Sequence, residues 1–192
     1  KINRYILKMA RKFRLEISFK DIDDLERKIQ FCINNDIKEL NVPCKGNIKK
    51  DFLLKVVKYL GEKYNNLNII YHYSLSHQYS RNFLESYKKL LAFLELCNKY
   101  DNNKILLISG SNKKDNFDSL IVLEKLKSEI NFNLKLGVAF NPFFPNQDLM
   151  RIERKRLEQK LSTGLVKSIW LQSGSNIEAL ENEIKFISNL IN

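Results

Sequence analysis

The segment NIIYHYSL at positions 68–75 shows the residue pattern on which the fold prediction depends. Ile69 and Tyr71 belong to one set of alternate positions, and the set between them includes His72. Because alternate residues of a β-strand point to the same side, the segment predicts a strand with one apolar face and one face that carries polar groups. The same alternation recurs in other segments, and the order of those segments decides between the competing folds.

Apolar residues recur at every second position in some segments and about every 3.6 positions in others. These two spacings take turns along the chain, which indicates alternating strands and helices. Strands are predicted at 13–19, 38–43, 68–75, 104–109, 134–140 and 166–172. Helices are predicted at 21–35, 48–63 (broken near Gly61), 80–100, 117–131, 146–163 and 176–191. We expect Gly164 to end the fifth of these helices, and Ser175 or Asn176 to cap the last. Strict β–α alternation predicts parallel strands with right-handed crossovers.

Two architectures fit this order, an open doubly wound sheet and a β/α barrel. A central strand of an open sheet contacts helices on both faces and should be apolar on both. Here several strands carry polar residues on one face, including Glu16, His72, Asn141 and Gln172. We therefore predict a TIM-type (β/α) barrel whose polar face lines the interior. A complete barrel has eight units, so this one is either incomplete or closed by a protein partner that covers its open edge.

The length and composition indicate one globular domain over residues 1–192. No apolar run approaches the roughly 18–20 residues of a membrane span. The three cysteines, Cys32, Cys44 and Cys97, match no metal-binding or C-x-x-C spacing. They are typical of buried, reduced thiols, which predicts an intracellular location in the cytoplasm or the mitochondrial matrix.

The N-terminal stretch and the charge each allow two interpretations. Residues 1–12 are basic and amphipathic, and they are either the remnant of an organelle transit peptide or an ordinary N-terminal helix or extension. The net charge of +11 indicates either an acidic partner such as RNA or anionic lipid, or a lysine-rich composition spread over solvated helices.

Barrel enzymes carry their functional groups at the carboxyl ends of the strands and in the loops that follow. That rule selects Glu16, Asn41, His72, Ser74, Ser109, Gly110, Ser111, Asn141 and Gln172. For each residue the competing interpretation is a hydrogen-bonded packing role. Glu16 lies between apolar neighbours, so burial should raise the pKa of its carboxyl, as a general acid requires. The alternative for Glu16 is an internal ion pair with Arg14 or a lysine.

The stretch LLISGSNKKD at 106–115 runs from an apolar strand into Ser109-Gly110-Ser111. Glycine lets the backbone approach a ligand closely, and neighbouring N–H groups can form an anion-binding nest. The simpler interpretation is an ordinary turn. No zinc-binding spacing surrounds the two histidines, and no glycine-rich nucleotide motif occurs in the chain.

The order of several segments resembles the methylenetetrahydrofolate reductase family, which consists of flavin-linked β/α barrels. The segments are LEISF (15–19), YHYSL (71–75), LLISGS (106–111), LGVAFNPFFP (136–145), RLEQKLSTG (156–164) and IWLQ (169–172). The resemblance spans residues 13–187 and is strongest over 136–172. It implies an oxidoreductase of one-carbon metabolism that passes a hydride from a nicotinamide cofactor to FAD and then to a folate-type substrate.

The resemblance also implies roles for individual residues. Glu16 corresponds to the general acid of the family, and Gln172 to a glutamine that contacts the folate. His72 and Ser74 correspond to the flavin-contacting end of the third strand. Asn141 and Lys160 occupy positions that contact the flavin and lie near its phosphates, respectively.

Three departures from the family pattern favour a different function. The family ends its fourth strand with Leu-Arg-Gly-Asp, whereas this chain has Ile108-Ser109-Gly110-Ser111. The fifth strand leads into Asn141-Pro142-Phe143-Phe144-Pro145 in place of Tyr-Pro-Glu-x-His-Pro, and units seven and eight are absent. The alternative prediction is therefore a non-catalytic barrel, a pseudoenzyme that serves as a subunit of a larger protein or ribonucleoprotein assembly.

Overall fold

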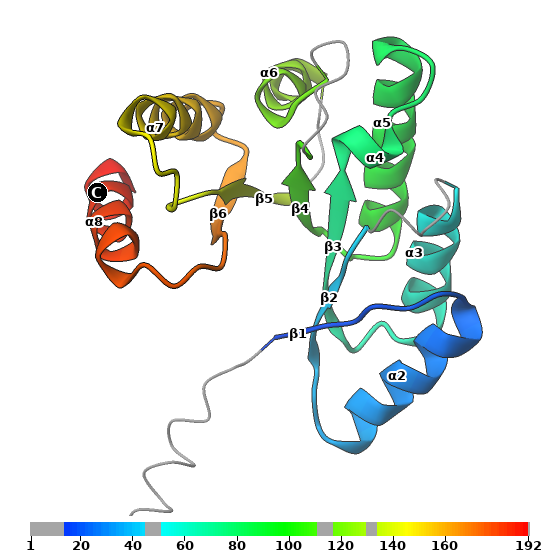
Figure 1. Ribbon diagram of the computed structural model, residues 1–192. Coiled ribbons are helices and arrows are strands. Elements are labelled where there is room, and N and C mark those ends of the chain that lie inside the picture. Colours follow the sequence, from blue (N-terminus) through cyan, green and yellow to red (C-terminus); the bar gives the residue numbers. More distant parts are fainter. Residues whose placement is uncertain (1–13, 45–50, 111–116, 130–133, 192) are drawn as a thin grey trace, which may run out of the picture.

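Figure 1 shows the computed structural model, in which residues 14–44, 51–110, 117–129 and 134–191 are described. Its strands are β1 (Leu15–Glu16), β2 (Glu39–Val42), β3 (Asn68–Ser74), β4 (Lys104–Ile108), β5 (Lys135–Phe140) and β6 (Val166–Leu171). Its helices are α2 (Ile22–Asn34), α3 (Phe52–Lys63), α4 (Leu75–Gln78), α5 (Phe83–Lys99), α6 (Ser119–Glu129), α7 (Gln147–Ser162) and α8 (Ile177–Ile191). The predicted N-terminal helix or extension lies outside the described residues.

The six strands form one sheet in the order β1-β2-β3-β4-β5-β6, and every neighbouring pair is parallel. Each strand is added to the same edge of the growing sheet. In a doubly wound fold, by contrast, the strand order reverses at one point. The sheet curls, and the long helices lie along its outer side (Figure 1). The predicted barrel-type architecture of alternating β/α units is therefore confirmed.

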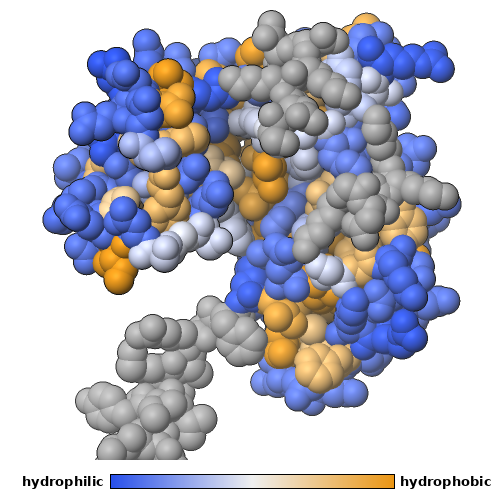
Figure 2. Space-filling model, in the orientation of Figure 1, coloured by the Kyte–Doolittle hydropathy of each residue, from blue (hydrophilic) through white to orange (hydrophobic). Residues whose placement is uncertain are grey.

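Within the part of the chain that the structure describes, the curled sheet is open and has β1 and β6 as its two ends. Figure 2 shows the open side as a notch between the surface formed by β6 and α8 and the surface formed by β1 and α2. None of the helices within the described residues has the length and apolar character of a membrane span.

The two faces of the sheet carry the residue types that the alternation predicts. On the outer face, Leu40, Tyr71 and Val138 are fully buried beneath the helices. On the inner face, the register brings His72 level with Leu106, and Gly137 level with Ser168. The apolar core therefore lies between the sheet and the helical layer, and the polar positions line the concave side.

Helix ends follow local sequence signals. Asn176 Oδ1 accepts a 3.0 Å hydrogen bond from the Ala179 N–H, so Asn176 rather than Ser175 caps α8. Gly164 has a φ of 76°, a left-handed conformation that favours glycine, and α7 ends just before it as predicted. Cys32 and Cys97 are buried free thiols, as predicted, whereas Cys44 is half-buried.

Two details of the prediction are wrong. The short helix α4, at the carboxyl end of β3, was predicted as part of a strand and a loop. Helix α3 runs through Gly61 to Lys63 without a break. A Cβ at position 61 would lie 2.7 Å from Tyr100 Cβ, so the missing side chain makes room for the Tyr100 ring.

Candidate functional site

The middle of the inner face is occupied by the ring of Trp170, which lies on β6. Its Nε1 donates a 3.1 Å hydrogen bond to Ser168 Oγ, and its centroid is 6.2 Å from that of His72 on β3. A Cβ at Gly137 would lie 2.8 Å from Trp170 Nε1, so only glycine lets the indole lie across β5. His72, 7% exposed, is therefore enclosed on the inner face beside an aromatic ring.

The carboxyl ends of β1 and β2 place Glu16 level with Asn41. Asn41 is 7% exposed, and no described residue donates a hydrogen bond to its buried Oδ1. Glu16 is exposed, so the burial expected for its carboxyl is absent. Glu16 lies on β1, which is one end of the sheet and has β2 as its single neighbour among the described strands.

The turn after β4 joins three elements. Ser109 Oγ lies 2.8 Å from Ser119 Oγ and accepts a 3.0 Å hydrogen bond from the Ser119 N–H at the start of α6. Gly110 has a φ of 82°, and a Cβ there would lie 2.8 Å from Ser76 Cβ on α4. Ser109 and Gly110 thus have packing roles, and Ser111 lies outside the described residues. The anion nest at this turn stays a prediction.

Ser74, Asn141 and Gln172, which were predicted to contact a flavin or a folate, lie at or after the carboxyl ends of three strands. Ser74 caps α4 by accepting a hydrogen bond from the His77 N–H, and its Oγ would be 3.5 Å from a Cβ at Gly110. Asn141 Oδ1 accepts a 2.9 Å hydrogen bond from the Phe143 N–H after β5. Gln172 is exposed at the end of β6, the opposite edge of the sheet from Glu16. The structure therefore brings Ser74, Ser109 and Gly110 together, and it places Glu16 and Gln172 on the two end strands of the sheet.

Lys160 lies apart from these residues, in the outer helix α7, six residues before β6 begins. It is 5% exposed, and burial lowers the pKa of its ammonium below 10.5. The charge of Arg156 lowers that pKa further, whereas Glu153 and Asp118 raise it. Lys160 is therefore a buried residue of the helical layer, a position that the sequence did not suggest.

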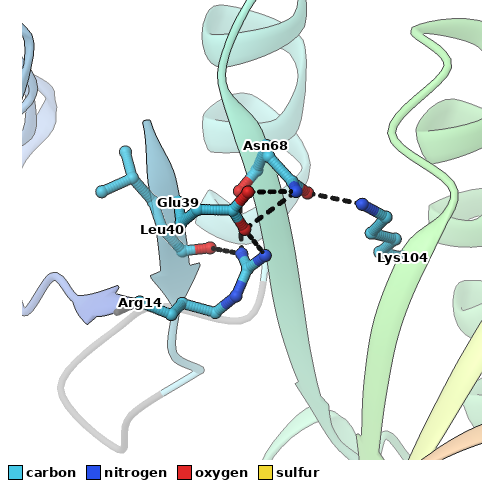
Figure 3. Close-up of polar contacts among 5 residues, drawn as sticks. All are labelled: Arg14, Glu39, Leu40, Asn68 and Lys104. Carbon is cyan, nitrogen blue, oxygen red and sulfur yellow. Dashed lines mark hydrogen bonds and ion pairs between the residues drawn. The ribbon is translucent and has the colours of Figure 1, made fainter. Parts of the chain in front are cut away.

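The amino-terminal half of the inner face holds a polar network that sequence reasoning missed (Figure 3). Arg14 donates 2.8 Å hydrogen bonds to the carbonyls of Leu40 and Asn68 and forms an ion pair with Glu39. Asn68 Nδ2 donates to Glu39, and Asn68 Oδ1 accepts a 2.7 Å hydrogen bond from Lys104 Nζ. Alternation predicts that these side chains share a face, but only the strand register shows that they meet.

The comparisons with known proteins concern the architecture. No family model matches the chain, and no curated protein does either. Among solved structures, the chain is similar to a dihydropteroate synthase from Coxiella burnetii in complex with pteroic acid, with 13% identity over 90% of each chain and a TM-score of 0.37. The barrel assignment therefore depends on the strand order and helix placement described above, and the resemblance to methylenetetrahydrofolate reductases stays a prediction. Within the described residues, no cluster of His, Cys, Asp and Glu could hold a metal ion.

Replacing Lys160 by methionine should stabilise the protein by about 1 kcal/mol at pH 7, because an apolar side chain avoids burying a charge. The lowered pKa means that the unfolded chain binds more protons than the folded chain between the folded pKa and 10.5. The stability of the wild type should therefore rise relative to that of Lys160→Met as the pH approaches 10.5. Urea unfolding of both proteins at pH 7 to 10.5 measures this, and a constant difference across that range would contradict it.

Proposed function

We propose that this chain functions as a subunit of a larger assembly, in which a partner extends the sheet beside β6. The partner element is a β-strand followed by an amphipathic helix. Its strand would add in parallel to β6, and its helix would pack against α8. This arrangement continues the β/α order that the chain itself follows.

The edge formed by β6 and α8 supports this proposal because it is poorly covered. None of the six residues of β6 is buried, and Glu183 is the one buried residue of α8. In β5, one strand further in, most residues are buried. An unpaired edge strand with exposed apolar neighbours is a surface that another chain can extend.

The observation that carries the proposal is a stripe of isoleucines along α8. Ile177, Ile184 and Ile191 are 71%, 45% and 65% exposed, and they recur at every seventh position. Residues seven apart lie on one line of a helix, the pattern of helix-packing surfaces. Glu183 and Phe186 contact α7 through Arg154, and Ile184 lies on a different flank from both. The stripe therefore faces away from α7. It lies on the flank of α8 against which the helix of a further unit would pack.

The proposal is tested with the full chain isolated from its native cells under mild conditions. We expect a complex far larger than the 22.7 kDa chain, and a photo-crosslinker at Ile184 should attach to a strand–helix segment of a partner. The substitutions Ile177→Glu and Ile184→Glu should release the chain as a monomer. A matched control, Leu84→Glu with Leu149→Glu, changes two exposed apolar residues of α5 and α7 and should leave the complex intact.

A monomeric wild-type chain, or equal loss of the complex in both double variants, would contradict the proposal. Nuclease treatment identifies the kind of assembly. If the complex is a ribonucleoprotein, RNA digestion should reduce its mass, and its RNA affinity should fall steeply with salt because counterions are released on binding.

A second candidate function is a divergent FAD-dependent oxidoreductase that acts on a folate-type substrate at the carboxyl ends of the strands. The buried Oδ1 of Asn41, which no described residue contacts by a hydrogen bond, favours a ligand on this face. In this proposal Glu16 is the general acid, His72, Ser74 and Asn141 contact the flavin, and Gln172 contacts the substrate.

The flavin proposal is tested by the absorbance spectrum of the purified protein before and after FAD is added. A bound flavin band that weakens in Asn41→Ala would support it. Protein that stays colourless and takes up no added FAD would rule it out.

A further inference from the structure

We propose that the amino-terminal half of the sheet's inner face binds a phosphate-bearing ligand with a planar ring, such as a nucleotide. The site is a cavity of about 570 Å³, a volume in the range of small-molecule sites. It is lined by Arg14, Ile70, Lys104, Ile105, Lys135, Lys167, Ser168, Ile169, Trp170 and Leu171. On β4 and β5 it differs from the predicted rim, because Lys104 and Lys135 are the first residues of those strands, whereas on β6 it extends to Trp170 and Leu171 near the carboxyl end.

The charge of the cavity indicates an anionic ligand. Among the described residues that line it, four are cationic and none is acidic. The nearby carboxylate of Glu39 is paired with Arg14 and accepts hydrogen bonds from Asn68. Because this carboxylate is already engaged, the described lining residues keep an excess of positive charge at the concave side of a sheet, where low-dielectric walls strengthen the attraction of an anion.

Two of the cations are held in place before any ligand binds. The guanidinium of Arg14 is fixed by the carbonyls of Leu40 and Asn68, and Lys104 Nζ is held by Asn68 Oδ1 (Figure 3). Because these side chains are already ordered, a ligand that binds them loses less conformational entropy.

A local irregularity supplies a third cation. The pairing of β5 with β6 shifts between Leu136 and Gly137, so Lys167 is an extra residue between Val166 and Ser168. A bulge of this kind redirects a side chain, and bulges occur often beside functional sites. Lys167 therefore lines the cavity next to Ser168.

Trp170 indicates that the ligand has a ring. Its indole extends over Gly137 and forms one wall of the cavity. Aromatic side chains stack on nucleobases, and such stacking combined with cations is the usual chemistry of nucleotide recognition. An anionic ligand without a ring would need the lysines but not the aromatic wall that Trp170 forms.

The experiment uses the fluorescence of Trp170, which is the only tryptophan of the chain and therefore reports on this cavity alone. Adenosine monophosphate is titrated against the full chain, with pyrophosphate and adenosine as separate probes. We expect saturable quenching by adenosine monophosphate, competition by pyrophosphate, and much weaker binding of adenosine. Isothermal calorimetry on Trp170→Phe, which keeps an aromatic ring, checks that binding does not depend on the reporter.

Matched variants separate the cavity from the overall charge. Lys135→Gln with Lys167→Gln should weaken binding of adenosine monophosphate about tenfold. Lys127→Gln with Lys185→Gln removes the same charge from exposed positions of α6 and α8 and should change the affinity less than about twofold. Circular dichroism of both proteins confirms that they fold.

Three results would overturn the proposal. The first is no fluorescence change at millimolar nucleotide. The second is equal weakening in the two double variants, which would assign binding to net charge. The third is much tighter binding of an RNA oligonucleotide that the cavity variant abolishes, which would make this site an RNA contact rather than a nucleotide site.

Discussion

Asp118→Ala is expected to lower the free energy of unfolding by about 3 kcal/mol, because this carboxylate has two structural roles. Its Oδ1 accepts hydrogen bonds of 2.9 and 3.2 Å from the N–H groups of Leu120 and Ile121 in the first turn of α6. Its Oδ2 lies 3.1 Å from Nη2 of Arg156 on α7. Asp118 is 7% exposed. Its removal therefore eliminates the helix cap and the ion pair, and it leaves a gap at a buried position.

Asp118→Asn separates the two roles of this residue. Asparagine is as good a helix cap as aspartate, so the variant keeps the cap and loses the charge on the Arg156 contact. We expect it to lose about half as much stability as the alanine variant, measured by urea unfolding at neutral pH. If both variants lose the same amount, the cap contributes little and the contact between α6 and α7 accounts for the whole effect.

The order of helices and strands was predictable because each unit carries its own period. Val138 and Phe140 alternate with small or polar residues, and the helices carry apolar faces and capping residues such as Asn176. These signals are local, and the parallel order of the sheet follows from alternation alone. Boundaries were less accurate at β1, where only Leu15 and Glu16 pair, because an end strand has one neighbour to fix its length.

The candidate site was less predictable because it depends on the register between strands. The position of Trp170 over Gly137 and beside His72 requires the register shift at Lys167, which no local pattern in the sequence indicates. Glu16 was expected to be buried because its neighbours in sequence are apolar, whereas its exposure follows from its place on β1, an end strand of the described sheet. Local sequence patterns predict on which face of a strand a residue lies. Its burial and its contacts depend on segments that are distant in the sequence.

Gly61 shows the same limit for a single residue, because a glycine in a helix pattern indicates either a break or a close approach. The structure has the close approach, so Gly61→Val should lower the free energy of unfolding by about 3 kcal/mol, as overpacking of a filled site does. A Cβ at this position would lie 2.7 and 2.8 Å from Cβ and Cδ1 of Tyr100. Urea unfolding measures the loss.

The decisive measurement is the sign of Gly61→Ala in two backgrounds. In the wild type, the clash with Tyr100 should outweigh the gain in helix propensity, and the variant should be less stable. In Tyr100→Ala the clash is gone, and the same substitution should stabilise the protein by up to about 1 kcal/mol. Gly164→Ala is the control, because its φ of 76° makes alanine unfavourable although no atom lies within 4 Å, so its effect should be the same in both backgrounds. If Gly61→Ala has the same sign in both backgrounds, Tyr100 is not the reason for glycine at this position.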